Sequence, residues 1–225
     1  FFSRKIGLAQ GKVVPIKAGA RMTGKVGDVQ VGFLNIQAGE LNEVGSDGKS
    51  TLVAPSTNFG VTRVFRELGN RTRFGGILVS KFNTADTGDY NLTYGMDGRL
   101  GVGDALTFDG WFSATETPGS GGLTGGEYAF SGSASHQTRD WQNAISYREV
   151  GDSFNPEVGF LPRKAYRFIS VRLLRHIRFP EISWFRELRP HISWREHWDL
   201  NGFSETRQVH IDNHFEFSNG AFFQL

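Results

Sequence analysis

Three side chains that can bind a metal ion stand at alternate positions near the end of the chain: His210, Asp212 and His214. Every second side chain of a β-strand points to the same face, so a strand here would place all three together. Imidazole and carboxylate groups are ligands of zinc and related cations. A plain row of polar side chains gives the same pattern, and the spacing matches no established metal motif. We therefore predict no metal and no cofactor, and these three residues are the candidates if that prediction fails.

A second polar row lies between residues 188 and 199, where His191, Arg195 and His197 fall on one face of an expected strand. Such a row could bind an anionic sugar or a phosphate group through its positive charges. Charge pairs within a polar surface are the alternative explanation. We assign His191 and Arg195 as candidate ligand-binding residues.

Carboxylates at Asp97, Asp109 and Glu116 raise the question of glycoside hydrolysis. That reaction needs two carboxyl groups at a defined separation across the glycosidic bond, which the sequence does not give. Neither Gly-x-Ser-x-Gly nor His-Glu-x-x-His occurs in the chain. We assign no catalytic residue and do not expect an enzyme, and a hydrolase is kept as an alternative.

The tryptophans divide into two groups by their neighbours. Trp111 stands among Thr107, Asp109 and Ser113 on an expected polar face, where its ring could stack on a sugar. Trp141 begins an apolar face and suits the aromatic belts found where a membrane meets water. We therefore predict that Trp111 contacts a ligand, and that the other tryptophans mainly anchor the fold.

Composition excludes several classes of protein. The 225 residues are 38% hydrophobic, and no apolar run approaches the roughly 18 residues of a membrane helix. The net charge of +2 comes without a basic run, so no nucleic-acid partner is expected. There is no cysteine, and the first residues do not form a signal peptide.

The elements that must position these residues are stretches of roughly ten residues with period-two hydrophobicity. In the first long stretch Ala18, Ala20 and Met22 alternate with Lys17, Arg21 and Lys25. Such segments, separated by turns, are typical of a β-barrel that crosses a bacterial outer membrane. A soluble β-sandwich also alternates, but its strands usually have about five or six residues. We expect strands at residues 3–8, 14–25, 29–38, 58–67, 73–83, 91–100, 105–115, 127–137, 141–150, 166–178, 188–199 and 205–217, with another starting at Ala221.

The connections alternate in length. Tight turns rich in Gly, Asn and Asp are expected at residues 26–28, 68–71, 102–104 and 138–140. Long polar loops are expected at residues 39–57, 84–90, 116–126 and 151–165. Bacterial barrels place short turns in the periplasm and long loops outside. The aromatic connection at residues 179–187 breaks this rule, and we expect it along the membrane interface.

The alternation also predicts which side chains meet lipid. The lipid-facing set is Ile16, Ala18, Ala20, Met22, Leu92, Tyr94, Phe130 and Ile211, and Ser133 and His210 are expected on the opposite side. Lys17, Arg21, Lys25, Asp97 and Arg99 are expected to face a watery interior and to select solutes there, together with Asp109, Trp111, His191 and Arg195.

Five stretches carry a resemblance to a known group: Phe1–Leu8, Val14–Lys25, Asn58–Val64, Phe154–Phe160 and Trp184–Pro190. Through them nearly the whole chain resembles the C-terminal outer-membrane β-barrel region, a domain of unknown function, of bacterial proteins that begin with a family-9-like carbohydrate-binding domain. The resemblance implies a barrel and a glycan-related role through an upstream domain. It implies no catalytic residue.

Taken together, we expect an all-β, antiparallel up-and-down transmembrane barrel over residues 1–225, as an incomplete segment of a larger barrel whose upstream domain and downstream strands lie outside this sequence. The expected location is the bacterial outer membrane, with lipid as partner and a glycan as a further one. The expected role is a passage or a surface platform. A glycoside hydrolase and a structural barrel that displays an upstream carbohydrate-binding domain are the alternatives.

Overall fold

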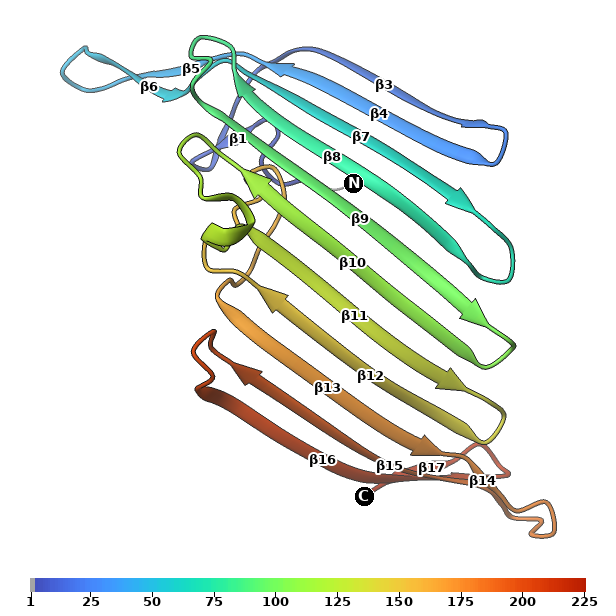
Figure 1. Cartoon of the computed structure of the whole chain (residues 1–225). Helices are drawn as coiled ribbons and strands as arrows, with labels where there is room; N and C mark the ends of the chain where they lie inside the picture. The colour runs from blue at the N-terminus through green and yellow to red at the C-terminus, as the bar shows by residue number, and fades with distance from the viewer. Residues whose placement is uncertain (1–2) are drawn as a thin grey trace.

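The computed structural model describes residues 3–225 and is built from β-strands (Figure 1). Within that range one antiparallel sheet of 13 strands accounts for most of the chain. Its strands are β3 (Ile16–Val26), β4 (Val29–Ala38), β7 (Thr57–Glu67), β8 (Arg73–Asn83), β9 (Tyr90–Val102), β10 (Leu106–Glu116), β11 (Tyr128–Gln137), β12 (Trp141–Val150), β13 (Tyr166–Arg175), β14 (Ile177–Arg178), β15 (Phe185–Trp198), β16 (Ser204–Phe217) and β17 (Phe222–Gln224). Two small hairpins stand apart, β1 (Leu8–Ala9) with β2 (Lys12–Val13) and β5 (Leu41–Val44) with β6 (Ser50–Ala54).

The order of the strands in the sheet follows their order in the chain, and neighbouring strands pair antiparallel. The predicted all-β, antiparallel up-and-down order is therefore confirmed. The sheet is open: β3 forms one edge, and β16 with the short β17 forms the other (Figure 1). β17 pairs only with residues 214–216 of β16. Among the described residues, no helix is long and apolar enough to span a membrane, and the single 3₁₀ turn, η1, covers Gly122–Gly125.

Short and long connections lie at opposite ends of the sheet, as predicted. The tight turns after β3, β7, β9 and β11 share one end, here called the turn end (Figure 1). Gly27 and Gly103 have φ values of +59° and +54°, which glycine adopts without strain. The long connections after β4, β8, β10 and β12 share the other end, here called the loop end.

The first predicted strand, residues 3–8, is wrong. Residues 4–7 form bends and turns, and the chain then makes the β1–β2 hairpin instead of joining the large sheet. Gly7, Gln10 and Gly11 all have positive φ, which breaks an extended strand. The last predicted strand does form, as β17.

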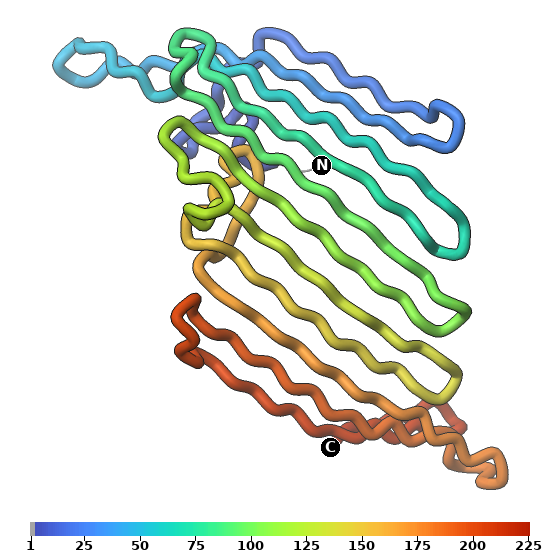
Figure 2. Tube along the Cα trace, viewed as in Figure 1, coloured from blue at the N-terminus to red at the C-terminus, as the bar shows by residue number. Residues whose placement is uncertain are grey.

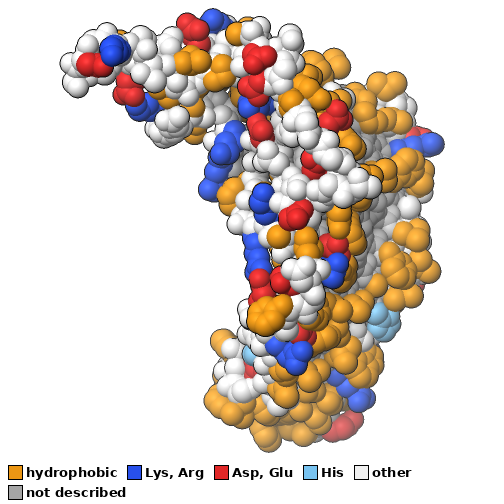
Figure 3. All heavy atoms as spheres, turned by 60° about the vertical axis from the view of Figure 1, so that its left-hand side comes forward, with side chains coloured by type: hydrophobic (Ala, Val, Ile, Leu, Met, Phe, Trp, Pro, Cys, Tyr) orange, Lys and Arg blue, Asp and Glu red, His pale blue; other side chains and the backbone are white. Residues whose placement is uncertain are grey.

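The two faces of the sheet differ in chemistry. On one face, register places Met96 beside Phe112 and Ile192 beside Ile211. Large apolar side chains of this face are exposed, and in Figure 3 they gather along the convex side, while charged side chains line the hollow side. The two sides are called the outer and the inner face below.

The facing predictions hold except at Ile16 and at Lys17, the bulged residue of β3. Ala18, Ala20, Met22, Leu92, Tyr94, Phe130 and Ile211 lie on the outer face, and Arg21, Asp97, Ser133 and His210 lie on the inner face. Ile16 is wrongly predicted: it pairs with Ala38 on the inner side and lies close to Gly7. A bulge at Lys17 changes the alternation, because an extra residue shifts every side chain beyond it to the other face.

Polar groups border the apolar outer face at the loop end. Tyr128 and Tyr147 each donate a hydrogen bond to Glu149, both at 2.7 Å, and Arg167 donates to the same carboxylate at 3.1 Å. Glu196, which is buried, accepts from Arg207 at 2.8 Å. The hydrophobic surface therefore ends at a defined level before the loops begin.

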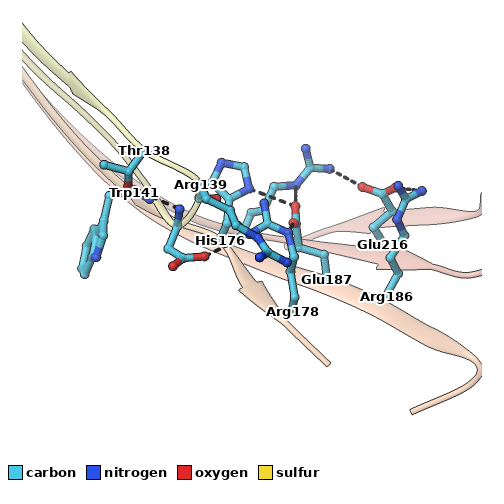
Figure 4. A network of polar contacts seen from close by, with 10 residues as sticks. Thr138, Arg139, Trp141, His176, Arg178, Arg186, Glu187 and Glu216 are labelled. Carbon is cyan, nitrogen blue, oxygen red and sulfur yellow. Dashed lines mark hydrogen bonds and ion pairs between the residues drawn. The ribbon is translucent and has the colours of Figure 1, made fainter. Parts of the chain in front are cut away.

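At the turn end a charged network ties the last strands together (Figure 4). Glu187 is buried, with His176 Nδ1 3.0 Å from one of its oxygens and Arg178 Nε 2.9 Å from the other. Glu216 binds Arg186 at 3.0 Å and Arg189 at 3.2 Å.

Aromatic rings lie at the same end, including Phe179 against Phe185 with centroids 5.2 Å apart, and Trp184 against Phe217 at 6.2 Å. The unusual connection at residues 179–187 is thus an ordered aromatic segment.

Candidate functional site

The inner face of the sheet holds the polar residues that the sequence singled out. Strand register places them in three groups, each on different strands. Arg21 and Lys25 lie on β3, Asp97, Arg99, Asp109 and Trp111 lie on β9 and β10, and His191 and Arg195 lie on β15. Lys17 belongs to none of these groups, because it is the bulged residue and lies against Gly39 at the loop end.

A basic hollow forms over β3, β4 and β7. Arg21, Lys25 and Arg63 line it together with Gln30 and Phe65, around a volume of about 810 Å³. Three cationic side chains on one concave wall create a positive potential that attracts anions. Arg63 is neutralised in part, because it forms an ion pair with Asp97 of β9.

A second hollow surrounds Trp111 in the centre of the sheet. Trp111 pairs with Asp97 on one side and with Ser131 on the other, and Asp109 pairs with Ser133. These side chains, with Arg73, Arg148 and Ser146, line a volume of about 350 Å³. An exposed indole ring beside hydroxyl and guanidinium groups offers stacking and hydrogen bonds to a sugar.

The predicted carboxylates are not arranged for hydrolysis. Asp97 binds Arg63, and Asp109 binds Arg99 at 2.6 Å. Each of the two carboxylates therefore faces a guanidinium group, and they do not face each other. Glu116 lies on the outer face, where it pairs with Leu92 and accepts from Tyr90 at 3.3 Å. Glu116 therefore lies on the opposite face from the two aspartates.

His191 and Arg195 share the inner face with Trp111 but stand far from it. Three strands, β11 to β13, separate β10 from β15, and neighbouring strands are about 4.8 Å apart, which gives roughly 19 Å. A single small ligand would not reach from Trp111 to Arg195. His191 lies instead beside His210 and His214, with ring centroids 5.1 and 5.0 Å away.

Sequence reasoning missed the most prominent feature of the inner face, which is a loop folded onto it. The connection between β12 and β13, residues 151–165, turns back across the sheet to the N-terminal segment (Figure 2). Ser3 donates to the carbonyl oxygen of Val158 at 2.6 Å. Residues that are more than 150 positions apart therefore meet above the inner face.

Polar side chains of the sheet hold this loop, called the inward loop below. Asn91, fully buried on β9, donates to the carbonyl oxygen of Asn155 at 2.9 Å and accepts from the backbone N–H of Glu157 at 3.2 Å. Thr115 Oγ1 accepts from the N–H of Asn155 at 3.1 Å. Lys81 Nζ binds Glu157 at 2.7 Å.

Apolar packing completes the attachment. Val158 is buried against Phe59, Val61 and Val79, which face inward near the loop end. Between the inward loop, the N-terminal segment and β4 to β8 lies a hollow of about 560 Å³, whose charged groups are Lys5, Lys81 and Glu157. The loop end of the inner face is thus partly covered.

No family model matches this chain, and neither the curated proteins nor the solved structures contain a match. The resemblance to a carbohydrate-linked barrel family therefore remains an expectation.

Proposed function

We propose that this chain forms a wall of a β-barrel in a bacterial outer membrane, and that its inner face borders a passage for small polar solutes. One observation carries the proposal: a sheet of long antiparallel strands has an exposed apolar convex face and a charged concave face. Soluble monomers rarely expose a continuous apolar patch beyond a few hundred Å². Lipid on one side and water on the other accounts for both faces.

The length of the apolar zone supports a membrane. On β12 the outer face runs from Trp141 near the turn end to Glu149 near the loop end. These eight steps span about 27 Å along the strand at roughly 3.4 Å per residue, or about 21 Å of membrane depth for a strand tilted by about 40°. An outer-membrane barrel needs an apolar band of about 25 Å, bounded by aromatic residues. Trp141 at one limit and Tyr147 beside Glu149 at the other fit those boundaries.

The chemistry of the inner face favours anionic solutes and sugars. Arg21, Lys25 and Arg63 provide the positive wall, and Trp111 provides the stacking surface. Solutes that combine hydroxyl groups with negative charge, such as acidic sugars, match both hollows. The two hollows lie on neighbouring parts of one face, because Arg63 and Asp97 join them.

Ion selectivity in planar lipid bilayers tests the passage. We expect the protein, purified from the membrane fraction, to conduct with a preference for anions. The double change Arg21→Glu and Lys25→Glu should shift the reversal potential toward cations, and Lys49→Glu on the β5–β6 hairpin should leave it unchanged. A protein that inserts but does not conduct, or a selectivity that the double change does not move, would refute the proposal.

A second candidate is a display platform with a blocked interior, which the inward loop favours. Its packing around Val158 and the four contacts of Asn91, Thr115 and Lys81 cover part of the inner face. In that case conductance should be absent from the wild type and should appear when the loop is loosened by Asn91→Ala.

A further inference from the structure

A cluster of metal-binding side chains stands on the inner face where β15 meets β16, away from the basic hollow and the hollow around Trp111. His191, His210 and Asp212 each offer a ligand atom, and these atoms all lie within 4.8 Å of one another. Register explains the cluster: His191 is directly opposite Asp212, and His210 is two residues before it on the same face. Spacing along the chain singled out His210 and Asp212 as metal-ligand candidates. The pairing of β15 with β16 adds His191 to them.

Two atoms in the cluster lack the partners that buried polar atoms normally have. Nδ1 of His191 and Oδ1 of Asp212 are both shielded from solvent without a hydrogen bond. Buried polar atoms in native structures nearly always have a hydrogen-bond partner, an ordered water or an ion, so each unpaired atom calls for one. Both atoms can coordinate a cation, and a bound ion would satisfy them together.

The carboxylate is held in place by a neighbour. Oδ2 of Asp212 lies 3.1 Å from Nε2 of His214, and that ring nitrogen is also 3.1 Å from Nε2 of Gln224 on β17. Carboxylates that ligate a metal are themselves held by hydrogen bonds from neighbouring groups, which fix their orientation. His214 is accordingly a positioning residue, and the three ligands are His191, His210 and Asp212.

We propose that His191, His210 and Asp212 bind one zinc-class divalent cation between β15 and β16. Two imidazoles and one carboxylate suit Zn²⁺, which takes nitrogen and oxygen ligands and keeps a fourth position open to solvent in three-residue sites. In a tetrahedral zinc site the ligand atoms stand about 3.4 Å apart. The half-exposed ring of His210 has room to close the remaining distance.

Such an ion would cross-link β15 and β16 at one edge of the sheet. β16 has only the three residues of β17 beyond it, so its hydrogen bonds to β15 are the main support of that edge. The metal site does not depend on the proposed passage, and either can stand if the other fails.

Zinc and cobalt titrations of the purified, chelator-treated protein test the site. We expect one Zn²⁺ per chain, and with Co²⁺ the visible absorption of a nitrogen–oxygen site. His210→Gln and Asp212→Asn should weaken zinc binding by at least about tenfold, and His214→Gln should weaken it by about tenfold through misplacement of Asp212. His210 is half exposed, so its replacement should leave folding intact, as circular dichroism would verify.

His197→Gln is the matched control, because His197 lies on the inner face of β15 but packs against Phe168 with ring centroids 4.4 Å apart, outside the cluster. It should bind zinc as the wild type does. The proposal is overturned if the wild type binds no zinc. It is equally overturned if His210→Gln and Asp212→Asn bind as tightly as the wild type, or if His197→Gln loses as much affinity as they do.

Discussion

Neighbouring residues on one strand of this sheet are predicted to meet different solvents. On β11, Ala134 lies on the outer face between Phe108 and Ile145, while Ser133 lies on the inner face between Asp109 and Ser146. The same charge placed at each position should therefore have opposite consequences.

We predict that Ala134→Arg destabilises the membrane-inserted protein by about 2–4 kcal/mol, since a guanidinium facing lipid near mid-depth carries that cost. The measurement is reversible folding into lipid vesicles, followed by urea titration. Ser133→Arg is the control and should change stability by less than about 1 kcal/mol, because its side chain reaches water. Equal effects of the two changes would contradict the assignment of faces.

At the residue scale the sequence predicted well which side chains share a face, because strict alternation of polar and apolar residues in strands such as β9 and β11 permits only one assignment. It failed at Ile16, where the bulge at Lys17 inserts an extra residue that no period-two pattern reveals. It also failed to bring His191 to Asp212, because strand pairing, and not spacing along the chain, creates that contact.

Among the elements, the inward loop determines how open the inner face is. Its attachment depends on few polar contacts, and Asn91 supplies two of them from a fully buried position. Loss of the Asn91 side chain should leave the backbone groups of Asn155 and Glu157 without partners.

We predict that Asn91→Ala frees the inward loop. Loss of two buried hydrogen bonds should cost about 1–3 kcal/mol locally. Tryptic cleavage after Arg163 and Lys164, both exposed in the loop, should accelerate roughly tenfold or more. Thr115→Val removes a single contact and should give a smaller acceleration, and Asn42→Ala on the β5–β6 hairpin should give none. Unchanged cleavage in Asn91→Ala would mean that the loop is held by other forces.

The charged network at the turn end is a second element-level test. Glu187→Gln removes the carboxylate that faces His176 and Arg178, and we predict a loss of about 1.5–3 kcal/mol in the free energy of unfolding. Arg186→Gln breaks a pair with Glu216 in which the arginine is mostly exposed, so it should cost less than about 1 kcal/mol. Urea denaturation of both variants gives the comparison, and a larger effect from Arg186→Gln would contradict this ranking.

Strand boundaries were largely predictable from sequence, since turns with Gly, Asn and Asp separate the alternating stretches. Residues 3–8 were the exception, because Gly7 within the stretch and Gln10 and Gly11 just after it have positive φ, which interrupts an extended strand. The fold of the inward loop was not predictable. Its stretch Phe154–Phe160 is distinctive in composition, but nothing local specifies that Asn91, 64 residues before Asn155, receives it.

For the whole molecule, the open sheet sets a condition on any membrane role. In the described residues, β3 and most of β16 present edges without a neighbouring strand. Unpaired backbone groups cost several kcal/mol each in hydrocarbon, so both edges must be paired in a membrane. We predict slow amide exchange in lipid for the β3 amides that point toward β4 and also for those that point away from it, measured by hydrogen–deuterium exchange. Fast exchange at alternate β3 amides would show that this edge faces water.

The central claim is that the outer face meets lipid and the inner face meets water, and cysteine accessibility tests it most directly. The chain has no cysteine, so single replacements along β11 need no altered background. In lipid vesicles, cysteines at Ser131, Ser133 and Ser135 should react with a membrane-impermeant maleimide, and cysteines at Phe130, Gly132 and Ala134 should be protected. Uniform reactivity along the strand, or protection of the serine positions instead, would contradict the account.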